Sequence, residues 1–329
     1  MLKVGLDTFT IRELELSSFG QLDYARSHGF EGVQFDDIYQ LSPTLDAGQL
    51  REVHCYADEL SLYSHVSITY CNPHFHKEST DIVRERLCDE INAAAEAGWH
   101  ELRSTLGGVD ERYNHPVHWF KQLEDSEKFL LALRPVLKDY GSRINLETHG
   151  DSTTYELIRL IERIGPDVLG INLDTANVLV HAEDPVAAAR RVAPYTHLTH
   201  AKDGILFFSE NGLMRQGRPP GQGVVDWERV IPSLAHFSPD LPLSLEDHKW
   251  LFEIRIADER WGDLHPGASA YEIGTLVKLA WGIQQRIDSG DLPPVAQYEA
   301  VPYLEQMEDR IACGRDYLLA VLRKLGLRS

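Results

Sequence analysis

The sequence predicts a single (β/α)₈ barrel with a C-terminal helical extension. Short apolar segments that end in a polar residue recur through the first three quarters of the 329-residue chain, and stretches with helical periodicity separate them. Eight strands, each followed by a helix, are the number that closes a parallel barrel. No GxGxxG-type phosphate loop follows the first segment, which disfavours the rival fold, a doubly wound open sheet.

The expected strands are near-continuous apolar runs, as suits a sheet that is buried on both faces. In chain order they are Leu2–Asp7, Gly32–Asp36, Leu62–Ile68, Glu101–Ser104, Arg143–Glu147, Val168–Asp174, His197–His200 and Leu241–Glu246.

Capping signals mark several of the intervening helices. Thr80–Gly98 has its apolar residues three and four apart and ends in glycine, and a similar helix ends at His28-Gly29. Asp226 is expected to be the N-cap of another helix. Two long loops interrupt the regular spacing, Gly107–Phe120 after the fourth strand and Asp203–Val225 after the seventh.

The expected division places a catalytic barrel in residues 1–250 and a helical extension in residues 251–329. The extension contains two strong helices, about Ser269–Ile287 and Val301–Leu325, joined by a turn with Pro293-Pro294. It is far longer than one closing helix, so it packs either on the barrel or on another subunit, in a homo-oligomer or with a different partner.

Composition excludes some classes of partner. Acidic residues outnumber basic ones by 51 to 32, a net charge of -19, which opposes binding to nucleic acid. No stretch approaches the ~20 apolar residues that a membrane span needs. The four cysteines are scattered, with no CxxC pair, as is typical of a reduced cytoplasmic protein. We therefore expect a cytoplasmic protein that binds neither nucleic acid nor membranes.

Four successive strands end in residues that commonly bind metals: Glu147, Asp174, His200 and Glu246. The strand ends of a parallel barrel open on one face, so these side chains are expected to converge. Three bare carboxylates there would repel one another, and a divalent cation removes that repulsion. Three oxygen ligands and one imidazole suit Mn²⁺, Mg²⁺ or Co²⁺, with Zn²⁺ less suitable.

The motifs around these residues resemble the xylose-isomerase-like barrels, a superfamily of sugar isomerases, epimerases, dehydratases and endonuclease IV-type proteins. They are Leu146-Glu147-Thr148-His149, Asn172-Leu173-Asp174-Thr175-Ala176-Asn177, Thr199-His200-Ala201-Lys202-Asp203 and Leu245-Glu246-Asp247. The resemblance covers about residues 1–250 and implies one bound metal, often Mn²⁺.

Two departures from the family pattern narrow the reaction. Asn177 stands where endonuclease-type members and ketose 3-epimerases have a histidine, and Leu206 stands where the epimerases have an arginine. DNA repair and free-ketose 3-epimerisation are therefore disfavoured.

His149 lies two residues after Glu147, and residues two apart on a strand face the same way. It is expected beside the metal, as a fifth ligand, as a base, or as a hydrogen-bonded loop histidine. We regard His149, Glu147 and Glu246 as the candidate catalytic residues. The metal would stabilise an enediolate, which is either reprotonated, as in an isomerase or epimerase, or expels a β-substituent, as in a lyase.

The Glu-x-His pattern with a long C-terminal extension is similar to the α subunits of C-glycoside deglycosidases. That resemblance implies elimination from a 3-oxo sugar or glycoside and a smaller β subunit as partner. It makes a lyase the leading hypothesis, a sugar isomerase or epimerase the second, and a non-catalytic barrel subunit the third.

Further polar residues are candidates for contacts with the substrate. Lys202 and Asp203 could bind sugar hydroxyls or order His200, and Arg103 could bind an oxyanion or form a structural salt bridge. Asn145 and Asn177 are either hydroxyl contacts or turn residues, and His65 is expected to line the pocket.

Overall fold

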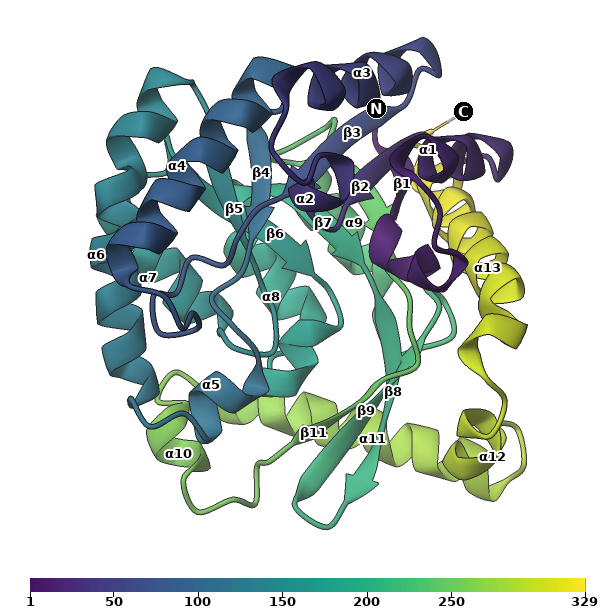
Figure 1. The fold of residues 1–329 in the computed structure, drawn as a ribbon. Coiled ribbons are helices and arrows are strands. Elements are labelled where there is room, and N and C mark those ends of the chain that lie inside the picture. Colours follow the sequence, from purple (N-terminus) through teal and green to yellow (C-terminus); the bar gives the residue numbers. More distant parts are fainter. Residues whose placement is uncertain (329) are drawn as a thin grey trace.

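The structure, a computed structural model, describes residues 1–328 and contains the expected closed barrel of eight parallel strands. The strands are hydrogen-bonded in the order β1-β10-β7-β6-β5-β4-β3-β2 (Figure 1). Their bounds are β1 (Lys3–Asp7), β2 (Gly32–Phe35), β3 (Tyr63–Ser67), β4 (Glu101–Ser104), β5 (Arg143–Glu147), β6 (Leu169–Asp174), β7 (Thr196–Ala201) and β10 (Pro242–Leu245).

Helices surround the barrel in alternation with its strands (Figure 1). The longer ones are α1 (Ser18–Ser27), α3 (Ala47–Glu59), α4 (Thr80–Ala97), α6 (Trp119–Asp139), α7 (Thr154–Ile164), α8 (Pro185–Val192) and α9 (Trp227–Ala235). Short helices are α2 (Ile38–Leu41), α5 (Val109–Tyr113) and the 3₁₀ turns η1 (Thr8–Leu14), η2 (Asn177–His181) and η3 (Ala193–Tyr195).

Local capping sets several helix ends as the sequence predicts. The Asp226 carboxylate accepts the backbone N–H of Arg229 at the start of α9. Gly98 follows α4 with φ of +114°, a left-handed conformation that glycine adopts without strain.

The C-terminal extension packs on the barrel. After β10 the chain forms β11 (Leu251–Ile254), α10 (Trp261–Leu264), α11 (Ala270–Asp288), α12 (Val295–Glu299) and α13 (Tyr303–Lys324). Helix α13 contacts α9, β1 and β10, and its Met307, Ile311 and Leu318 are buried in the main core. Helix α13 therefore takes the place of the eighth barrel helix. The expected boundary at residue 250 thus assigns this barrel helix to the extension.

The long loop expected after the seventh strand contains a β-hairpin. Strands β8 (Asp203–Ser209) and β9 (Gly212–Arg218) pair antiparallel, and β11 adds to β9 (Figure 1). The two turn residues are Glu210 and Asn211, between the paired Ser209 and Gly212. An Asn-Gly dipeptide between two apolar runs, here Asn211-Gly212, is a sequence signal for a hairpin. Helix α11 packs on β8, and Leu206, Leu213 and Leu276 belong to a second, smaller core.

No helix of residues 1–328 is both long enough and apolar enough to cross a membrane.

Candidate metal centre

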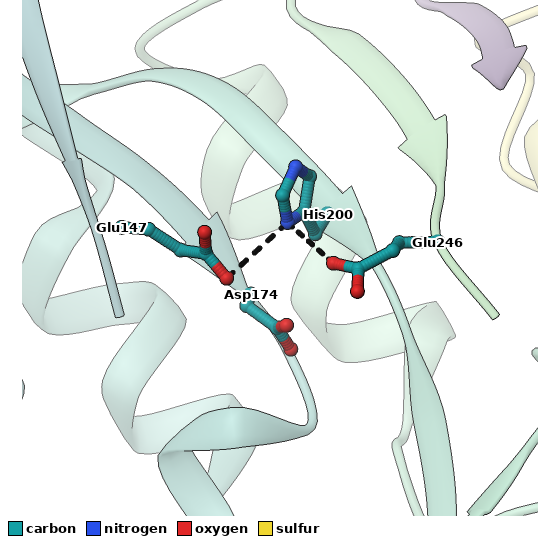
Figure 2. A group of neighbouring side chains, drawn as sticks. All are labelled: Glu147, Asp174, His200 and Glu246. Carbon is teal, nitrogen blue, oxygen red and sulfur yellow. Dashed lines mark ion pairs between the residues drawn. The ribbon is translucent and has the colours of Figure 1, made fainter. Parts of the chain in front are cut away.

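The four predicted ligands come together at the carboxyl-terminal end of the barrel. Glu147 and Asp174 are the last residues of β5 and β6, His200 lies near the end of β7, and Glu246 follows β10. In the sheet register, His200 is the partner of both Asp174 and Ser244. One ligand atom from each of the four side chains lies within 4.8 Å of the others. Figure 2 shows that the three carboxylates and the imidazole point toward one another.

The ligand atoms are buried, and within residues 1–328 two of them, Nδ1 of His200 and Oε2 of Glu246, make no hydrogen bond of normal geometry. They face each other as an ion pair at 2.6 Å. Glu246 is the most exposed of the four ligands, at 6%. Buried donor atoms that face one point without normal hydrogen bonds are what a metal ion would satisfy. This donor set therefore fits one divalent cation.

The electrostatics of the cluster support the same assignment. Burial favours a neutral imidazole, but Glu147, Glu246 and Asp7 outweigh it and raise the pKa of His200 well above its usual range. Without a metal, His200 would therefore hold a proton to offset the acids. Burial opposes ionisation of Glu246 as well, but Lys202 and His200 hold its pKa well below the usual value.

Two cationic side chains neutralise part of this charge. The Lys202 ammonium lies 2.7 Å from both Asp174 Oδ2 and Glu246 Oε1. Arg103 donates from Nε to Glu147 Oε2 at 2.7 Å, and its Nη1 lies 3.2 Å from Asp36 Oδ1.

A charge balance shows how much remains uncompensated. With His200 neutral, as a metal ligand must be, five carboxylates face three cationic side chains around the cluster, so two negative charges remain, which one divalent cation would balance. The carboxylates are Asp7, Asp36, Glu147, Asp174 and Glu246, and the cations are Arg103, Lys202 and Arg215.

Neighbouring groups orient the ligands. Nε2 of His200 lies 3.3 Å from Asp7 Oδ2 and 2.7 Å from the Gln34 amide nitrogen, so Nδ1 is the nitrogen that faces the cluster. Asp174 Oδ1 accepts the backbone N–H groups of Ala176 and Asn177, each at 2.9 Å.

Asn177 connects the cluster to the hairpin. Its Nδ2 donates to Asp174 Oδ2 at 2.6 Å, and its Oδ1 accepts from Arg215 Nη1 at 3.0 Å. Asn177 thus supports a ligand through its side-chain amide, which the sequence left open between a turn residue and a hydroxyl contact. Arg215 lies on β9, directly opposite Leu206 on β8.

His149 lies at the edge of a cavity of about 600 Å³. Its Nδ1 is 2.7 Å from the Gly107 carbonyl oxygen. This bond places the proton of the neutral ring on Nδ1 and leaves Nε2 with a free lone pair. His149 is outside the set of four converging ligand atoms. This arrangement suits a base better than a fifth ligand.

The other predicted site residues are Asp203, Asn145 and His65, and the first of them binds groups of its own loop. Asp203 accepts the backbone N–H groups of Gly204, Gly221 and Val225 and the Trp227 indole N–H, so its carboxylate organises the hairpin loop. These four donors leave it unsuited to binding a sugar hydroxyl or ordering His200.

Asn145 and His65 lie on β5 and β3, below the ligand layer. Asn145 Nδ2 donates to Glu101 Oε2 at 2.8 Å, which makes it a contact between strands rather than a substrate contact. His65 pairs in register with Gln34, and burial lowers the pKa of His65 to about 4, so the ring is neutral near pH 7.

Sequence reasoning missed several residues around the cluster. Asp7 and Gln34 contact His200, and His248 Nε2 lies 3.5 Å from Glu246 Oε1. Asp7 carried a usable signal, because it is a polar residue at the end of the first strand. Gln34 lies within an apolar strand, where its sequence neighbours do not reveal that it reaches His200.

Residues 22–261 match the family described as xylose isomerase-like TIM barrel, and the chain belongs to that family. It is also 26% identical over 110 residues to the uncharacterized protein YihM of Escherichia coli (strain K12). That match spans 33% of this chain and 34% of YihM, about a third of the relative's length.

Solved structures share the fold at low identity. D-psicose 3-epimerase with D-tagatose from Clostridium cellulolyticum H10 has a TM-score of 0.60 at 14% identity, covering 87% of this chain and 99% of that one. The 3-keto-D-glucoside 4-epimerase YcjR from E. coli has a TM-score of 0.56 at 14% identity, covering 81% and 98%. A xylose isomerase domain protein from Planctomyces limnophilus has a TM-score of 0.56 at 17% identity, covering 82% and 93%.

Proposed function

We propose that this protein is a divalent-metal-dependent lyase that removes a proton beside the carbonyl of an oxidised (3-oxo) sugar or glycoside and eliminates the β-substituent. The observation that carries the proposal is the free Nε2 of His149 at a cavity, two residues after Glu147 of the candidate metal cluster. A divalent cation bound there, Mn²⁺ in our proposal, would polarise the substrate carbonyl and stabilise the negative charge that forms as the adjacent proton leaves.

The surroundings of the carboxylates favour His149 as the base. Arg103 donates to Oε2 of Glu147, while Lys202 contacts Oε1 of Glu246. Although burial opposes ionisation, these cations and His200 lower the pKa values of both carboxyl groups. A carboxylate with a depressed pKa is a weak base, so Glu147 and Glu246 would serve catalysis as ligands.

The second candidate is a sugar isomerase or epimerase that uses the same site without a leaving group. The names of the structural neighbours favour it, since two of them are 3- and 4-epimerases of sugars. One is named for a 3-keto-D-glucoside, the class of oxidised sugar that we propose here.

One incubation separates the two candidates. The Mn²⁺-loaded protein is mixed with a 3-oxo-β-glucoside in D₂O, and both aglycone release and deuterium incorporation are followed by NMR. Aglycone release supports the lyase, whereas deuterium incorporation with an intact glycosidic bond favours the isomerase or epimerase. If neither occurs, both candidates are wrong for this substrate class, and the non-catalytic barrel subunit gains support.

Replacing the proposed base tests the mechanism. We expect His149→Asn to lower turnover by roughly 10² to 10⁴, the usual contribution of a positioned base, while Mn²⁺ stoichiometry stays unchanged. His236→Asn, at an exposed position after α9, is the matched control and should keep full activity. Loss of Mn²⁺ from His149→Asn would instead assign His149 as a ligand.

A further inference from the structure

Two cavities lie at the barrel mouth on either side of Tyr70 and Phe75. One has a volume of about 580 Å³ and the other about 600 Å³, and these two residues line both. Arg103, which donates to the metal ligand Glu147, lines the first cavity, and His149 lines the second. Both cavities therefore adjoin the proposed reaction centre.

The linings of the two cavities suit different chemical groups. The first combines polar groups of Asp36, Thr69, Arg103 and Thr105, which could bind the hydroxyls of a sugar, with apolar walls such as Ile68. The second has the aromatic side chains of Trp250 and Phe252 beside the shared Tyr70 and Phe75. These four rings match a flat apolar group, while charged side chains such as Glu111, Glu253 and Arg255 line the rest of the cavity. A substrate that filled both would place the bond between its two parts near Tyr70.

The Tyr70 hydroxyl is available at that junction. Within residues 1–328 it makes no hydrogen bond to the protein, and its ring packs against Phe75 at a centroid distance of 4.6 Å. Burial raises the pKa of Tyr70 above its usual value, and the nearby carboxylates of Glu147 and Asp36 also raise it, whereas Arg103 lowers it. The phenol therefore keeps its proton near neutral pH.

We propose that Tyr70 is the catalytic residue that donates a proton to the departing oxygen, and that this oxygen belongs to an aryl or similarly flat apolar group. The inference rests on the proposed lyase function. Tyr70 lies on the segment after β3, and its role depends on its position between the two cavities.

In a 3-oxo glycoside, the proposed reaction is an elimination across C1 and C2. Nε2 of His149 takes the proton from C2, and the electron pair left behind forms the C1–C2 double bond. The C1–O bond breaks as this double bond forms, and the departing oxygen keeps the bonding pair and takes the Tyr70 proton. The products are an unsaturated 3-oxo sugar and a phenol or alcohol, and Tyr70 is reprotonated by the solvent or by His149.

Leaving-group dependence tests this role. Wild type, Tyr70→Phe and Phe75→Leu, each loaded with Mn²⁺, are compared on the 4-nitrophenyl and 4-methoxyphenyl 3-oxo-β-glucosides. A good leaving group needs little protonation, so Tyr70→Phe should lose about 10² to 10⁴ in kcat on the methoxyphenyl substrate and less than about tenfold on the nitrophenyl substrate. Phe75→Leu, which removes a ring but no proton donor, should affect both substrates equally.

Unaltered Mn²⁺ stoichiometry and melting temperature establish that Tyr70→Phe is folded. Equal loss on the two substrates, or no loss on either, would overturn the assignment of Tyr70 while leaving the lyase function standing. If the wild type releases neither phenol, the proposed function and the role of Tyr70 fail together.

Discussion

The ion pair between Arg310 and Asp247 should be among the most stabilising contacts of the C-terminal extension. Arg310 on α13 donates from Nε and Nη2 to the two oxygens of Asp247, each at 2.6 Å, and the side chains are only 4% and 1% exposed. Asp247 directly follows the metal ligand Glu246. Removing one partner of a buried pair leaves an uncompensated charge and costs about 3–5 kcal/mol.

The expected effect of Arg310→Met follows from the size of the chain. An unfolding entropy of about 2.1 cal/mol/K per residue gives roughly 0.7 kcal/mol/K for 329 residues. A loss of 3–5 kcal/mol should therefore lower the melting temperature by about 4–7 °C, measured by differential scanning calorimetry on metal-free protein. The double variant Arg310→Met with Asp247→Asn should recover part of this loss, because no buried charge is left unpaired.

An exposed ion pair of similar length provides the control. Arg163 lies 2.8 Å from Glu127, but its side chain is 58% exposed. Arg163→Met should cost at most about 1 kcal/mol, or roughly 1.5 °C. Equal shifts for Arg310→Met and Arg163→Met would refute the reasoning that burial decides the strength of these pairs.

Metal binding, the Asp203 carboxylate and the His65 imidazole are each expected to affect the stability of the protein. Removal of metal with EDTA should lower the melting temperature, and Mn²⁺ at 100 times its Kd should restore about 2.7 kcal/mol; an unchanged melting temperature would count against the metal centre. Asp203→Asn should destabilise the protein by about 2–4 kcal/mol, since the amide nitrogen that replaces one carboxylate oxygen cannot accept from the two N–H donors that this oxygen served, and urea unfolding measures this loss. The pKa of His65 is lowered to about 4 when folded, so its contribution to stability is complete above its unfolded pKa and is lost as the pH falls toward 4. In His65→Gln the loss of stability between pH 6.5 and 4 should be shallower by about 1.4 kcal/mol per pH unit, and an unchanged slope in pH-dependent urea unfolding would show that His65 does not contribute.

Much of the metal centre was predictable because it depends on topology. Glu147, Asp174, His200 and Glu246 each stand at or beside the end of a strand, and all strand ends of a parallel barrel lie on one face. Their convergence needs only the correct strand assignment. The same argument did not extend to Asp203, which begins a hairpin strand and whose carboxylate is occupied by four donors of its own loop.

The hairpin and the eighth helix show two different limits of sequence reasoning. The Asn211-Gly212 dipeptide is a local signal for a hairpin, and the loop expected over Asp203–Val225 did not include one. The position of α13 had no local signal, because an amphipathic helix can bury its apolar face on its own barrel or on another subunit. Only the packing of Met307, Ile311 and Leu318 into the main core decides this.

The sequence alone determined the (β/α)₈ class and the convergence of four strand-end residues that could hold a metal ion, because periodicity and strand ends are local properties of the chain. The tertiary structure decided which neighbour each side chain contacts. Gln34 reaches His200 across 166 positions, and Arg310 reaches Asp247 across 63. Such pairs arise from register and packing between remote segments, so no local pattern in the chain specifies them. The residues of the candidate metal centre can therefore be predicted from the sequence. The side chains that orient these residues and neutralise their charge cannot.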